Sequence, residues 1–136
     1  MLAEFPGKVR LVFKDFPLSF HAGAMPAALA ARCAAEYGHY WEYHDLLFVA
    51  QPAFARSDLV LYGHRLALPP DAFAACFDGG RYRAAVQRDV QEGRAAGVTG
   101  TPTFFINGLR LTGIQPFDTF RDAVRDALED AGRKRP

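Results

Sequence analysis

The sequence has little net charge, few cysteines and no long apolar run, and each of these absences excludes a class of protein. Sixteen lysines and arginines stand against fifteen aspartates and glutamates, so no strong field favours binding to nucleic acid or to an anionic membrane. The longest stretch without a charged residue, Phe16–Ala31, contains two prolines and a histidine, and such a stretch is not expected to span a bilayer. The first residues, MLAEFP, have neither a basic nor an apolar region, so we expect no signal peptide.

The two cysteines and four histidines do not form a recognisable metal or redox motif. Cys33 and Cys76 stand far apart and form no Cys-x-x-Cys pair, and the histidines lack a His-Glu-x-x-His pattern. We therefore expect neither a bound metal nor another cofactor. Both cysteines fall on expected apolar helix faces, which favours inert buried thiols or a structural disulfide over a catalytic role.

Half of the 136 residues are apolar and 23% are charged, which is typical of one soluble globular domain. An apolar, β-branched run predicts a buried strand at Val9–Phe16. From Ala22 to Gly97 the period becomes helical and predicts five helices, with Ser57 as the N-cap of the third. Asn107-Gly108 then predicts a hairpin turn between the strands Thr103–Ile106 and Leu109–Thr112. The last expected helix is Phe117–Ala131, with its apolar residues on one stripe.

Four segments of the sequence resemble the DsbA-like thiol–disulfide oxidoreductases. They follow the family's order and together cover nearly the whole chain: VFKDFPL at 12–18, WEYHDLLF at 41–48, GVTGTPTFFING at 97–108 and QPF at 115–117. The resemblance implies an α/β, thioredoxin-like fold with an inserted α-helical subdomain in a single domain of residues 1–136. It implies a strand region at 1–19, the helical insert at 20–97, and the cis-proline loop, hairpin and C-terminal helix at 98–136.

The sequence also departs from the pattern of this family. A DsbA-like domain begins with a strand followed by Cys-x-x-Cys at the N-terminus of a helix, whereas this chain starts in what resembles the last turn of that helix. We therefore predict an N-terminally truncated version of the fold, whether through a shortened chain or a natural loss. In the family's fold the absent strand lies between the equivalents of Val9–Phe16 and Thr103–Ile106. Its loss predicts either direct pairing of these two segments or a homo-oligomer formed through exposed strand edges.

The resemblance also assigns candidate site residues. Thr101 and Pro102 correspond to the cis-proline loop, where the backbone of the residue before the proline pairs with an extended protein or peptide substrate. Some DsbA-like relatives carry a second, structural cysteine pair in the helical insert, which makes Cys33 and Cys76 a candidate disulfide. The family is mostly periplasmic or extracytoplasmic, but the compartment of this chain is left open.

The expected function is therefore protein dithiol oxidation or disulfide exchange, with this chain inactive on its own because it lacks Cys-x-x-Cys. Whether it is an enzyme is left open. One alternative is an enzyme similar to kappa-class glutathione transferases and their isomerase relatives, which share the helical insert and the cis-proline loop. The other is a non-catalytic peptide-binding domain that uses only the edge at Thr101–Pro102.

Overall fold

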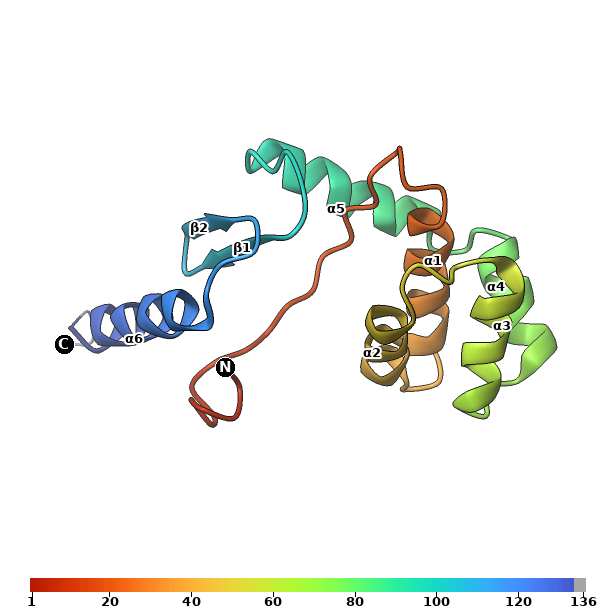
Figure 1. Ribbon diagram of the computed structural model, residues 1–136, viewed down its shortest axis with the longest axis horizontal. Coiled ribbons are helices and arrows are strands. Elements are labelled where there is room, and N and C mark those ends of the chain that lie inside the picture. The colour runs from red at the N-terminus through yellow and green to blue at the C-terminus, as the bar shows by residue number, and fades with distance from the viewer. Residues whose placement is uncertain (134–136) are drawn as a thin grey trace. The chain divides into compact units, whose positions relative to one another are not determined.

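A computed structural model describes residues 1–133, which contain helices and one two-stranded sheet (Figure 1). The elements in chain order are α1 (Ala24–Ala35), α2 (Tyr40–Ala50), α3 (Arg56–Arg65), α4 (Pro70–Asp78), α5 (Arg83–Ala95), β1 (Thr103–Ile106), β2 (Leu109–Thr112) and α6 (Phe117–Arg133). The chain divides into two compact units. The helical unit is Lys14–Ala95, and the hairpin unit combines Met1–Phe13 with residues 96 onward. That the chain forms a single domain stays a prediction.

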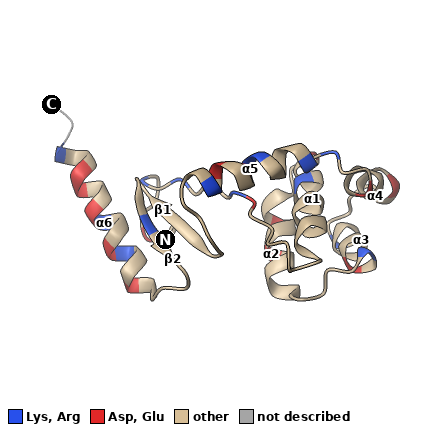
Figure 2. Ribbon diagram, turned by 90° about the horizontal axis from the view of Figure 1, so that it is seen from above, with Lys and Arg blue, Asp and Glu red and all other residues tan. Residues whose placement is uncertain are grey.

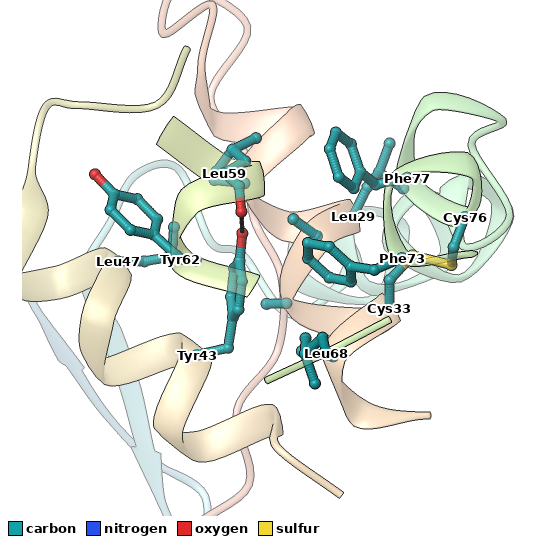
Figure 3. Packing of buried hydrophobic residues seen from close by; sticks show 14 of the residues in the cluster. Leu29, Cys33, Tyr43, Leu47, Leu59, Tyr62, Leu68, Phe73, Cys76 and Phe77 are labelled. Carbon is teal, nitrogen blue, oxygen red and sulfur yellow. Dashed lines mark hydrogen bonds between the residues drawn. A yellow bond between two sulfur atoms is a disulfide. The ribbon is translucent and has the colours of Figure 1, made fainter. Parts of the chain in front are cut away.

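The helical unit is built around α1, which packs against all four of the other helices. Alanines and small side chains let these helices approach α1 closely, and the fully buried side chains come from several of them (Figure 3). Tyr43 of α2 is buried and donates its hydroxyl to the carbonyl of Leu59 in α3 at 2.8 Å. Its ring contacts Phe73 of α4, with ring centroids 5.5 Å apart. The unit therefore has a core of its own.

The N-terminus of α3 differs from the sequence prediction. Ser57 lies inside the helix, and Ala55 is the N-cap. The carboxylate of Asp58 accepts the backbone N–H of Ala55 at 3.0 Å. A carboxylate in the first turn thus replaces the expected hydroxyl cap, and its charge is favourable at the positive end of the helix.

The hairpin in the other unit forms where the sequence predicts it. β1 and β2 are antiparallel, with Thr103 opposite Thr112 and Ile106 opposite Leu109. Asn107 and Gly108 both have positive φ, at 48° and 97°, as a tight two-residue hairpin turn requires. α6 packs on β1 through Phe120 and Phe104, whose ring centroids lie 4.7 Å apart. Residues of both charge signs alternate along α6 (Figure 2).

The strand expected at Val9–Phe16 does not form. Residues 9–18 have neither helix nor strand, and within residues 1–133 the sheet contains only β1 and β2 (Figure 1). Direct pairing of this segment with β1 is therefore absent from residues 1–133 as well. A strand exists only through the ladder it makes with a neighbour, and within residues 1–133 the sheet consists of the ladder between β1 and β2 alone. Apolar side chains are left exposed as a result, with Leu11 52% and Val12 59% accessible.

Candidate functional site

The loop before β1 is held to the hairpin at its C-terminal end. The peptide bond between Thr101 and Pro102 is cis, and Pro102 directly precedes the first residue of β1. The carbonyl of Pro102 accepts the backbone N–H of Gly113, just after β2, at 2.8 Å. The hydroxyl of Thr103 donates to the carbonyl of Gly100 at 2.7 Å. These two bonds fix the backbone on both sides of Thr101.

The N-terminal end of the same loop is held by Arg110 of β2. Its Nη1 donates to the carbonyl of Gly97 at 3.0 Å. Gly97 has a φ of +79°, and a Cβ at this position would lie 2.6 Å from Arg110 Nη1. A glycine is therefore needed for the turn and for the close approach of the guanidinium.

Thr101 is exposed and lies between the hydrogen-bonded positions of this loop. Within residues 1–133 its backbone N–H and C=O have no hydrogen-bond partner. A free donor and acceptor next to a sheet, on a backbone fixed at both sides, can pair with an extended peptide. The structure thus places Thr101 and Pro102, the two residues predicted as a binding site, at the entrance to β1.

The two cysteines lie in a different place, inside the helical unit. Cys33 of α1 and Cys76 of α4 are bonded, with an S–S distance of 2.04 Å and a Cα–Cα distance of 6.0 Å (Figure 3). Their exposed fractions are 0% and 2%. Neither sulfur is available as a thiolate nucleophile in this state.

A carboxylate accompanies this cysteine pair. Glu36 Oε1 lies 3.4 Å from the sulfur of Cys76. The guanidinium of Arg81 donates to both oxygens of Glu36 at 2.8 Å, and the hydroxyl of Tyr82 donates at 2.9 Å. Arg81 first, and then Tyr82, hold the pKa of Glu36 below its usual value. The charge near the sulfur is therefore neutralised by Arg81.

Sequence reasoning missed a group of buried charges in the helical unit. Asp15 and Asp89 are buried, and Arg32 of α1 bonds to both carboxylates. Asp89 of α5 also accepts the backbone N–H of Asp15 at 3.0 Å and the ammonium of Lys14 at 3.1 Å. These residues are too far apart in the sequence for any spacing rule to pair them. These bonds connect the segment at Lys14 and Asp15 to α1 and α5.

The histidines do not gather into a metal site. Across the part of the chain that the model describes, no three histidine, cysteine, aspartate or glutamate side chains could hold a metal ion. His39 faces Glu42 at 3.7 Å, and His44 faces Asp45 at 3.0 Å. None of the described helices is long and apolar enough to cross a membrane.

Comparison with known proteins connects these features to a family. The family model described as thioredoxin matches residues 2–126. The chain is 40% identical over 129 residues to a Na(+)/H(+) antiporter NhaA 3 of Salinispora tropica, covering 94% of this chain and 20% of that protein. It is 28% identical over 116 residues to a protein of Rickettsia conorii provisionally named a protein-disulfide oxidoreductase, covering 81% of this chain and 42% of that protein. The chain thus spans about a fifth to two fifths of the length of these relatives.

A solved structure shows the fold. The crystal structure of a thioredoxin-like oxidoreductase from Silicibacter pomeroyi matches with a TM-score of 0.83 and 22% sequence identity. The match covers 94% of this chain and 73% of that one. The expected α/β, thioredoxin-like fold is therefore confirmed. Because the family model covers nearly the whole sequence, this chain belongs to the thioredoxin family.

Proposed function

We propose that this chain provides the substrate-binding loop and the helical subdomain of a DsbA-like thiol–disulfide oxidoreductase. The observation that carries the proposal is the free backbone of Thr101, exposed and held at the start of β1. The substrate would be an extended segment of a protein, which pairs with Thr101 as an added strand. The Rickettsia relative supports the reaction class, since it is named for protein-disulfide oxidoreduction.

We further propose that the chain by itself performs no dithiol chemistry. Disulfide exchange needs a thiolate that attacks a substrate and a second thiol that resolves the mixed disulfide. The sequence has only Cys33 and Cys76, and the two are buried and bonded to each other. We propose that the cysteine pair has a structural role, which is to join α1 to α4.

Binding at Thr101 is tested by nuclear magnetic resonance on the whole chain. The probe is the peptide Ac-Ala-Val-Ser-Val-Ala-NH₂, which is extended and carries no thiol. We expect its addition to shift the Thr101 amide signal downfield, as a new hydrogen bond requires, and to leave the amide of Gly132 in α6 unchanged. A saturating peptide that moves no signal between Gly100 and Thr103 contradicts the proposed loop function.

The absence of dithiol chemistry is tested by insulin reduction with dithiothreitol. We expect the rate to equal that of dithiothreitol alone, because no reactive thiol pair is present. Turnover above this rate that disappears in Cys33→Ser would show that the buried pair is catalytic. The same assay separates a peptide-binding chain from an active oxidoreductase.

As the partner of the isolated chain we propose a second copy of itself, which pairs with it through strand edges. Residues 9–12 have no ladder partner within residues 1–133, and the outer edge of β1 has none either. Both segments carry exposed apolar side chains, among them Leu11, Val12 and Phe105. Unpaired apolar edges of this kind favour pairing with another chain.

A further inference from the structure

The helical unit contains a cleft that the proposed function does not use. It has a volume of about 510 Å³ and lies between the segment that leads into α1 and the C-terminal half of α5. This volume is within the range of sites that bind small ligands. Leu18, Met25 and Val90 supply an apolar lining, and methionine adapts its shape readily to an apolar ligand.

The polar lining comes mainly from one face of α5. Gln87, Gln91 and Arg94 follow each other at spacings of four and three residues, so their side chains lie on the same side of the helix, and all three line the cleft. The two glutamines offer amide donors and acceptors, and Arg94 offers a planar set of N–H donors. These groups can form several hydrogen bonds to one ligand.

The acidic residues of α5 are engaged elsewhere. Asp89 is buried among its bonds to Arg32, Lys14 and the backbone of Asp15, and Glu92 accepts the ammonium of Lys14 at 2.7 Å. No aspartate or glutamate lines the cleft among the residues that the model describes. The two sides of α5 therefore differ in charge, and the side facing the cleft is cationic.

Arg94 has no ion-pair partner within residues 1–133 although it lines the cleft. Its guanidinium is charged at every pH the protein experiences. The exposed guanidinium is therefore available to a ligand of negative charge in the cleft. The apolar side chains beside it require that the rest of the ligand be apolar.

We propose that this cleft binds a carboxylate attached to an apolar chain, with Arg94 and Gln91 holding the carboxylate. A planar carboxylate matches the guanidinium in a bidentate arrangement, and the apolar chain would contact Leu18, Met25 and Val90. A phosphate fits less well, because Arg94 is the one permanent cation among the lining residues described here. The C-terminus of a peptide and a small aliphatic acid share this chemistry.

The test is a titration of the whole chain followed through the side-chain amide signals of Gln87 and Gln91. The probes are Ac-Ala-Ala-Leu with a free carboxylate, the same peptide with a C-terminal amide, octanoate, and inorganic phosphate. We expect saturable shifts with the free carboxylate and binding at least about fivefold weaker for the amide, since the charge-assisted bond is lost. Octanoate binding better than the peptide acid identifies a small acid as the source, and the reverse identifies a peptide C-terminus.

Variants of α5 distinguish binding in the cleft from nonspecific electrostatic binding. Arg94→Gln is expected to weaken binding of the better carboxylate probe by about five- to tenfold, and Arg94→Lys to recover part of it. Arg88→Gln is the control, because Arg88 is exposed on the same helix and does not line the cleft. If Arg94→Gln fails to fold, Gln91→Ala carries the test, with an expected loss of about threefold.

Four results would overturn the proposal. They are the absence of saturable shifts with either carboxylate up to about 10 mM, equal binding of the peptide amide, equal binding of phosphate, and an equal loss of affinity in Arg88→Gln. Because the signals observed belong to α5, a failure here leaves the result at the Thr101 amide unaffected.

Discussion

Asp15 is the residue where burial and charge oppose each other most directly. Its exposed fraction is 5%, and it lies at the point where the chain enters the helical unit. Burial is the largest influence and raises the pKa of this carboxyl above its usual value, while the hydrogen bond from Arg32 acts in the other direction. Asp89, a second buried carboxylate, raises the pKa of Asp15 further.

This raised pKa predicts a pH dependence of stability. Above pH 3.8 the folded protein holds the Asp15 proton more tightly than the unfolded chain, so the free energy of unfolding falls as the pH rises through the pKa of the folded state. Asp15→Asn cannot titrate and is expected to lack this part of the slope, which is at most about 1.4 kcal/mol per pH unit. Urea unfolding of both proteins between pH 4 and pH 7 measures it. Parallel curves would show that the pKa of Asp15 is the same in the folded and unfolded chain, and a free energy of unfolding that rises with pH relative to Asp15→Asn would show that Arg32 outweighs burial.

At the scale of elements, α3 and α4 meet at a position that only glycine can occupy. A Cβ at Gly63 of α3 would lie 2.6 Å from Cε1 of Phe73 in α4. Phe73 cannot move aside easily, since it is buried and its ring contacts Tyr43 and Phe77. The missing side chain at Gly63 is therefore what lets the two helices pack this closely.

The same substitution is expected to have opposite effects in two helices. Gly63→Ala should lower the free energy of unfolding by about 1–3 kcal/mol through overpacking. Gly132→Ala in α6 meets nothing within 4 Å and should be neutral or stabilise by up to about 1 kcal/mol through helix propensity. Thermal or urea unfolding of the two variants measures the difference. A Gly63→Ala protein as stable as the unmodified chain would mean that α3 and α4 can separate without cost.

The cysteine pair joins two helices that are distant in the sequence. Cys33 of α1 and Cys76 of α4 are 43 residues apart, and we propose that their bond stabilises the helical unit by restricting the unfolded chain. Cys33→Ala/Cys76→Ala is expected to lower the free energy of unfolding by about 2–4 kcal/mol. A thiol titration of the unmodified chain in denaturant, without reductant, should find no free thiol. Two titratable thiols there would contradict the proposal.

At the scale of the whole molecule, the open strand edges determine the expected assembly. We predict that light scattering on the purified chain gives a mass above the 15.0 kDa of one copy, because pairing satisfies backbone groups that are otherwise left unpaired. Leu11→Lys/Val12→Lys should reduce the mass toward that of a monomer, since charged side chains oppose edge pairing. Val49→Lys is the control, because Val49 is exposed on α2 of the helical unit and belongs to neither edge. A monomeric unmodified chain at every concentration tested would exclude this assembly.

The hairpin and the helices could be predicted because their causes are local. Asn107-Gly108 permits the positive φ values of the tight turn, and the alternation and periodicity around it define the flanking strands and helices. Thr101 and Pro102 were singled out by the resemblance of residues 97–108 to the cis-proline loop of the DsbA-like family. The start of α3 was predicted wrongly, because Ala55 is the N-cap in place of Ser57 and its backbone N–H is bound by Asp58.

The sequence alone therefore determined the local elements, the absence of a Cys-x-x-Cys pair and the loop that carries Thr101. Tertiary structure decided whether Val9–Phe16 could be a strand, because a strand needs a neighbour that no local pattern specifies. It also decided which charges meet at Arg32 and which side chains of α5 face the cleft. Those contacts join residues distant in the sequence, and they depend on how the helices pack rather than on the spacing of residues along any one of them.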